Sequence, residues 1–146
     1  MTYRLLTVFT IAAFLSYAIR GSAQGSAIPS APAMRLASAG VYTDAQAARG
    51  RALYADNCIQ CHGGELDGVE EAPPLTGQLF LGRWGGLPVG ALHAFIDKTM
   101  PPGNGGALGA VQEADIVAYI LSKNGFPSGP KPLPADPAGL LGIALQ

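Results

Sequence analysis

The chain has 146 residues, of which 49% are hydrophobic and only 13% are charged, with a formal net charge of −1 at pH 7. This length allows one small domain once the terminal segments are set aside. The basic residues form no cluster, which excludes a surface suited to nucleic acid.

The N-terminal segment predicts an export signal. Arg4 precedes an apolar run at 5–19, and Gly21-Ser22-Ala23 supplies the small residues of a cleavage site. The run is short for a membrane span and contains polar residues. We therefore expect residues 1–23 to be a cleaved signal peptide and the mature protein to be periplasmic or otherwise exported. The alternative is an uncleaved anchor facing the periplasm, the one arrangement in which we expect membrane contact.

The remaining chain divides by composition. Residues 24–40 are rich in Ala, Ser and Pro without a repeat, which predicts a linker. Residues 41–127 are expected to form the folded domain. Residues 128–146 carry several prolines, which argue against a regular helix and predict an extended tail. A domain of this size is small for a self-sufficient core, which a large apolar cofactor would complete.

The domain is expected to be all-α, because no segment shows the alternation of a strand. Three helices are predicted, at about 43–57, 88–100 and 110–124. The first begins with the capping-box pattern Thr43-x-x-Gln46. Gly50 lies in its middle, where a glycine costs about 1 kcal/mol relative to alanine and predicts the close approach of another backbone.

The most specific motif is Cys58-Ile59-Gln60-Cys61-His62, which matches the C-x-x-C-H attachment signal for c-type haem. Two cysteines three apart on a helical turn present both sulfurs to one edge of a porphyrin, where each forms a thioether with a vinyl group. The adjacent histidine brings an imidazole nitrogen under the iron. We expect one covalently attached haem c, with Cys58 and Cys61 as the attachment residues and His62 as an axial ligand.

Other interpretations of the two cysteines are weaker. A thioredoxin-type pair should follow a strand, whereas a helix is predicted before Cys58. A zinc site lacks further ligands, because the only other histidine is His93. A disulfide between residues so close in the chain would constrain almost nothing.

The second axial position has two candidates. Met100 lies between a predicted helix and Pro101-Pro102, where a rigid turn can hold a thioether at a fixed distance. An isolated methionine often fills a core, but this proline-rich turn is a poor place for a core residue. His93 is the rival, although a lone histidine on an amphipathic helix is more often solvated or packed. We select Met100, since thioether ligation is the usual partner of histidine in cytochromes c.

These residues resemble a single-haem, class I c-type cytochrome over about residues 41–127. The resemblance implies a small fold in which the N- and C-terminal helices cross at Gly50 around the haem. It also implies that the Ala72–Gly77 loop lines the proximal side and that the Pro73 carbonyl accepts a hydrogen bond from His62. Leu75 and Trp84 are implied as further pocket residues, Trp84 either reaching a propionate or packing on the porphyrin.

A narrower resemblance is to cytochrome domains or subunits associated with quinoprotein alcohol dehydrogenases. It is carried by Tyr42-Thr43, by the stretch 63–68, by Ala72-Pro73-Pro74-Leu75 and by Asn124-Gly125-Phe126-Pro127. Gly109 departs from this family, which commonly has a serine cap before the last helix. Glycine is a tolerable cap, so only helix stability is affected.

The expected function is electron transfer, because two protein ligands would leave the iron no position for a substrate. An apolar shell of Leu75, Phe80, Leu92, Phe95 and Ile96 would lower the local dielectric. The expected partners are redox proteins: a dehydrogenase as donor and a terminal oxidase or another acceptor. The chain would then be no enzyme by itself. The alternatives are a non-catalytic subunit of a dehydrogenase complex, and a haem enzyme or gas sensor with an open distal site.

Overall fold

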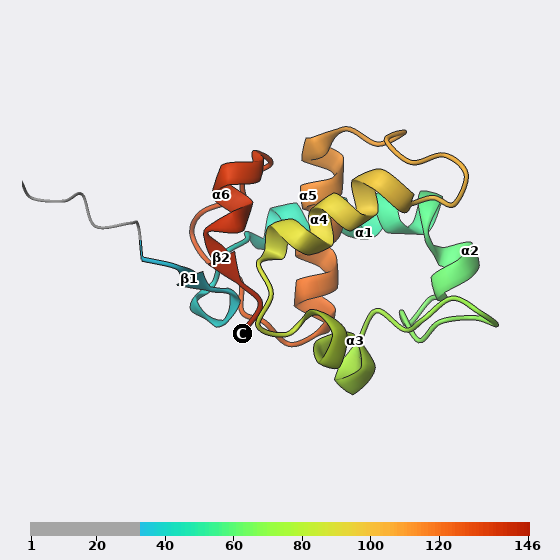
Figure 1. The fold of residues 1–146 in the computed structure, drawn as a ribbon, viewed down its shortest axis with the longest axis horizontal. Coiled ribbons are helices and arrows are strands. Elements are labelled where there is room, and N and C mark those ends of the chain that lie inside the picture. Colours follow the sequence, from blue (N-terminus) through green and yellow to red (C-terminus); the bar gives the residue numbers. More distant parts are fainter. Residues whose placement is uncertain (1–32) are drawn as a thin grey trace, which may run out of the picture.

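The structure is a computed structural model that describes residues 33–146 (Figure 1). The predicted signal peptide and the first part of the predicted linker lie outside the described residues. The elements in chain order are β1 (Arg35–Leu36), the 3₁₀ helix η1 (Ala37–Ala39), α1 (Asp44–Asn57), α2 (Ile59–His62), α3 (Gly77–Trp84), α4 (Val89–Thr99), α5 (Ala110–Lys123), α6 (Pro137–Leu141) and β2 (Ile143–Ala144). Within residues 33–146, no helix is long and apolar enough to cross a membrane.

The predicted all-α class is confirmed, and α1, α4 and α5 correspond to the three predicted helices. Two short segments add a two-stranded parallel sheet, with Arg35 opposite Ile143 and Leu36 opposite Ala144. Strands of only two residues are too short to show the alternation of apolar and polar residues by which a sequence predicts a strand. The sheet joins the two ends of the described chain.

The crossing of α1 and α5 organises the fold. A Cβ atom on Gly50 would overlap the backbone carbonyl of Asp115 and would lie 3.0 Å from Cβ of Tyr119. Beside this contact, Arg49 of α1 donates two hydrogen bonds to the Asp115 carboxylate, at 2.7 and 2.8 Å. The close backbone approach predicted at Gly50 is therefore present.

Side-chain and backbone caps fix the helix ends. The Thr43 hydroxyl accepts a hydrogen bond from the backbone N–H of Gln46 at 3.2 Å, which is one half of the predicted capping box. The other half is absent, because the Gln46 side chain bonds Leu133. Helix α5 ends at Lys123, and Gly125 follows its cap with a φ of 79°, which favours glycine. There the N–H of Phe126 bonds the Leu121 carbonyl, which is the Schellman arrangement.

The predicted extended tail differs from the structure. Residues 137–141 form the helix α6, with Pro137 in its first turn, where a proline is tolerated. The side chain of Asp136 caps this helix by accepting from the N–H of Gly139 at 2.7 Å. Most of the large apolar side chains of the tail are buried in the core, and Leu141 is the exposed one among them. The prolines thus delimit a short helix instead of preventing one.

The helix crossing generates a stability prediction. Replacing Gly50 with alanine should lower the free energy of unfolding by about 1–3 kcal/mol or more, because the new methyl group overlaps the Asp115 backbone. The matched control is Gly82→Ala on exposed α3, where an added Cβ meets no atom within 4 Å. That variant should gain about 0.5–1 kcal/mol. Denaturant unfolding of both variants measures the difference, and equal stabilities would contradict the crossing.

Candidate haem-binding site

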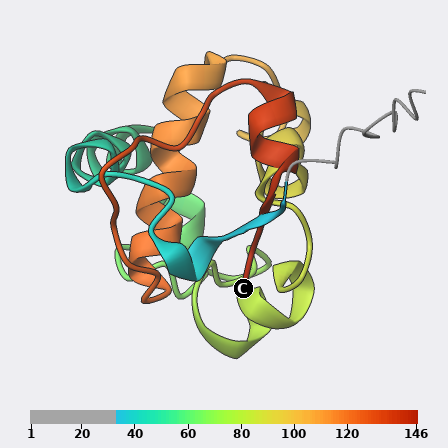
Figure 2. The ribbon, with the colours of Figure 1, turned by 90° about the vertical axis from the view of Figure 1, so that its left-hand side faces the viewer.

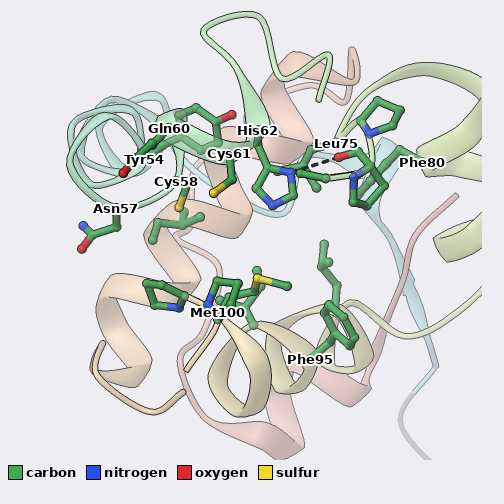
Figure 3. Close-up of a pocket in the computed structure, with 18 of the residues that line it drawn as sticks. Tyr54, Asn57, Cys58, Gln60, Cys61, His62, Leu75, Phe80, Phe95 and Met100 are labelled. Carbon is green, nitrogen blue, oxygen red and sulfur yellow. Dashed lines mark hydrogen bonds between the residues drawn. The ribbon is translucent and has the colours of Figure 1, made fainter. Parts of the chain in front are cut away.

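A cavity of about 840 Å³ opens between α2, α3, α4 and the loops that join them (Figure 3). Its lining is mainly apolar, and all five residues of the predicted shell contribute to it: Leu75, Phe80, Leu92, Phe95 and Ile96. The four residues predicted to attach or ligate the haem also line it: Cys58, Cys61, His62 and Met100. The structure therefore brings together residues that are up to 42 positions apart in the chain.

The two cysteines lie at the junction of α1 and α2. The N–H of Cys58 still bonds the Tyr54 carbonyl of α1 at 2.8 Å, while the Cys58 carbonyl accepts from the N–H of His62 at 2.9 Å. This single turn directs both sulfurs into the cavity (Figure 3). Burial, and secondarily the nearby Cys61, raises the pKa of the Cys58 thiol to about 11. The Cys58 thiol thus lies in an apolar environment, whereas Cys61 is exposed.

His62 is 8% exposed and extends from α2 into the cavity. Its Nδ1 lies 2.9 Å from the carbonyl oxygen of Pro73. A carbonyl can only accept, so Nδ1 carries the proton and Nε2 is left with a free lone pair. An imidazole in this state can ligate a metal, and the bond to Pro73 fixes its orientation.

Met100 lies on the opposite wall from His62 (Figure 3). It ends α4, and its N–H bonds the Ile96 carbonyl at 2.8 Å. The backbone leaves the helix in an extended conformation at this residue. The thioether is therefore attached to the C-terminal end of α4, and the position of its sulfur depends on how that helix packs.

His93 lies outside the set of described residues that line the cavity. Its Nε2 is 3.2 Å from the Ala110 carbonyl and 3.4 Å from Oε2 of Glu113, which ties α4 to α5. Glu113 is also buried, and its Oε1 has no hydrogen-bond partner among the described residues. Burial raises the pKa of this carboxyl, partly offset by His93. His93 thus has a packing role between two helices.

Arg83 is a cavity residue that the sequence reasoning missed. Its guanidinium lies 5.2 Å from the ring centroid of Trp84 and 5.0 Å from that of Phe95, and these two rings pack edge to face. Among the described residues that line the cavity, Arg83 is the only lysine or arginine. A signal existed, because Arg83 is the only Lys or Arg between Arg51 and Lys98. The guanidinium could pair with a carboxylate at the cavity mouth.

The donor set fits a covalently held haem. The cavity offers two thiols on one side, and an oriented imidazole and a thioether on opposite walls. Apolar side chains separate these groups, and a cation stands near the mouth. Among the described residues, no group of three or more His, Cys, Asp or Glu could hold a separate metal ion.

Comparison with known proteins adds three findings. A family model described as cytochrome C oxidase, cbb3-type, subunit III matches residues 45–120, more than half of the chain. The chain is 32% identical over 81 residues to the thiosulfate dehydrogenase of Stutzerimonas stutzeri (strain A1501), covering 51% of the chain and 26% of that protein. It is 31% identical over 97 residues to the thiosulfate dehydrogenase of Allochromatium vinosum (strain ATCC 17899), covering 62% of the chain and 34% of that protein.

Among solved structures, the crystal structure of the sulfane dehydrogenase SoxCD from Paracoccus pantotrophus aligns with a TM-score of 0.48 and 24% identity. The alignment covers 68% of this chain and 52% of that chain. The chain spans about a third or less of the length of the two thiosulfate dehydrogenases. The narrower resemblance to cytochrome domains of quinoprotein alcohol dehydrogenases stays a prediction.

Proposed function

The chain belongs to the family of cytochrome c oxidase, cbb3-type, subunit III, and from this premise we propose that it is an exported, single-haem electron carrier. The observation that carries the proposal is the meeting of His62 and Met100 across an apolar cavity that Cys58 and Cys61 border. Haem is joined to C-x-x-C-H outside the bacterial cytoplasm, which agrees with the predicted signal peptide at 1–23 and a periplasmic location.

Each residue has a distinct role in this proposal. Cys58 and Cys61 would form the two thioether bonds, so that the cofactor would not dissociate in a dilute compartment. His62 would hold the iron through Nε2, since its Nδ1 donates to the Pro73 carbonyl, which makes the imidazole a stronger ligand. Met100 would offer its thioether from the facing wall. A bound haem would supply an iron that gains or loses one electron.

The same residues favour a carrier over an enzyme. With imidazole and thioether both bound, the iron would have no position left for oxygen or a substrate, and the lining of the cavity is mainly apolar. The second candidate, a haem enzyme or sensor, would need Met100 to stay unbound. The position of Met100 at the end of α4, directly across from His62, supports the carrier.

The proposed donor is a dehydrogenase and the proposed acceptor is a terminal oxidase or another redox protein. Two relatives are named thiosulfate dehydrogenases, which favours a donor that oxidises an inorganic sulfur compound. The narrower sequence resemblance favours a quinoprotein alcohol dehydrogenase instead. In either case the chain would act as carrier or as a non-catalytic subunit of the donor complex.

Attachment is the first test of this function. After expression with a c-type maturation system, haem should remain with the polypeptide through denaturing electrophoresis and acid-acetone extraction. Cys58→Ala and Cys61→Ala together should abolish this retention, since no other cysteine is present. A reversible one-electron titration should accompany attachment, and extractable haem in the unaltered protein would refute the proposal.

Ligation by Met100 is tested with two variants on the same helix. Met100→Ala should remove the sulfur-to-iron charge-transfer band of the oxidised protein, lower the potential, and admit cyanide and carbon monoxide more readily. His93→Gln is the control, because His93 lies outside the cavity lining and its loss should leave the low-spin spectrum unchanged. The reverse pattern would make His93 the ligand.

The cavity mouth indicates how a redox partner docks. Residues 41–127 contain five basic and nine acidic residues, which gives a net charge of −4. Two of the five are already paired, Arg49 with Asp115 and Lys123 with Glu65. At the mouth, Leu79 is 73% exposed and Pro102 is exposed, and both line the cavity. We therefore propose docking through a small apolar surface rather than through a ring of lysines.

Leu79 provides the test of this docking surface. Leu79→Glu should slow reduction by the donor dehydrogenase about tenfold, because a charge would be desolvated in the contact. Val111→Glu is the matched control, since Val111 is 63% exposed but lies outside the cavity lining. Stopped-flow rates of the unaltered protein should change little with ionic strength. A steep fall with salt would indicate electrostatic steering instead.

A further inference from the structure

The last 19 residues form a structural unit, here called the C-terminal strap (residues 128–146). Five of its apolar residues are almost completely buried, at 0–4% exposure: Leu133, Leu140, Ile143, Ala144 and Leu145. Figure 2 shows α6 and β2 across one face of the molecule, with β1 beside β2. A segment with this burial belongs to the core of the domain.

Hydrogen bonds tie the strap to α1 at one end. The side-chain amide of Gln46 donates to the Leu133 carbonyl at 3.1 Å, and its oxygen accepts from the N–H of Leu133 at 2.7 Å. Gln46 is 3% exposed, so both bonds are buried. Buried bonds of this kind give the strap one fixed position relative to α1.

The other end of the strap pairs with the segment that leads into α4. The N–H of Gly86 donates to the Leu145 carbonyl at 2.9 Å, and the N–H of Leu145 donates to the Leu87 carbonyl at 2.9 Å. Pro88 and Ala144 form an antiparallel bridge next to them. The first turn of α4 therefore begins from a backbone that the strap holds.

The strap also packs directly against α4. A Cβ atom on Gly90 would lie 3.2 Å from Cβ of Leu140, so the two backbones approach closely at this point. Among the described elements, α4 packs mainly against α5 on one side and against α6 and β2 on the other. Without the strap, α5 would be the one major element left to hold α4.

The position of α4 determines where several residues of the cavity lie. Leu92, Phe95 and Ile96 line the cavity from this helix, and Met100 ends it. We propose that the C-terminal strap is a positioning element that keeps Met100 at its place opposite His62 by clamping α4 against α5. This inference rests on the proposed role of Met100 as a ligand. Leu140 is the main positioning residue, because it fills the contact at Gly90.

The test compares Leu140→Ala with Leu141→Ala in the full-length, haem-loaded protein. Leu140 is 0% exposed and Leu141 is 55% exposed, so the same truncation is made at neighbouring positions of one helix. Leu140→Ala should raise the rate of cyanide binding to the oxidised protein about tenfold, because a looser α4 releases Met100 more often. It should also raise hydrogen exchange at α4 amides. Leu141→Ala should change neither quantity.

General loss of stability is controlled by Tyr42→Phe. This variant removes the 2.6 Å hydrogen bond from the Tyr42 hydroxyl to the Phe126 carbonyl, at the end of the domain where α1 begins and α5 ends. It should lower the unfolding midpoint while cyanide binding stays at the unaltered rate. If Leu140→Ala and Tyr42→Phe accelerate cyanide binding equally for equal losses of stability, the strap has no specific role and the inference fails.

Two readouts separate this inference from the proposed function. Absence of the sulfur-to-iron band in the unaltered protein would refute ligation by Met100, and hydrogen exchange at α4 would still report whether Leu140 clamps the helix. Should Leu140→Ala fail to fold or load haem, Leu140→Val makes the same comparison with a smaller cavity. Unchanged α4 exchange in that variant would overturn the proposal.

Discussion

The backbone contact between α1 and α5 at Gly50 is the constraint on which the other parts of the structure depend. The helices approach so closely that no side chain fits between them, and Arg49 pairs with Asp115 beside the contact. The end of α1 carries Cys58, and α5 contributes Ile116 to the cavity lining. One contact therefore relates the attachment side of the cavity to the scaffold against which α4 packs.

The two walls of the cavity are held by different means. His62 lies on a single helical turn and is oriented by the Pro73 carbonyl, a contact within a short stretch of chain. Met100 depends on α4, whose position comes from α5 and from the C-terminal strap. The contacts that hold α4 join segments far apart in the sequence, so their closure entropy is larger than that of the contact between His62 and Pro73. The place of Met100 thus depends on packing between several elements, whereas that of His62 is set locally.

Sequence reasoning reached the local features and missed the long-range ones. The Thr43 cap, the close approach at Gly50 and the three long helices follow from short spacings, and these are present. The second half of the capping box is not, because the Gln46 side chain bonds Leu133 instead of the Thr43 backbone. Helix α3 was missed because Gly77 and Gly82 weaken its pattern. The prolines of the strap by themselves predict an extended segment, and the leucines between them form no pattern that predicts a helix. Burial of those leucines depends on α4 and α1, which no local window contains.

The arrangement also explains why a chain this short can hold a large apolar cavity open to a cofactor. Buried side chains of the strap, such as Leu140 and Leu145, form a second packed layer behind α4. The space between α2, α3 and α4 contains the cavity and so lacks packing contacts between side chains. The layer behind α4 compensates for these missing contacts. The cavity face of α4 can then be devoted to the cofactor, while its opposite face supplies the packing. A helix that lines a cavity with one face and packs with the other needs a structural element behind it. In this chain, residues 128–146 supply that element.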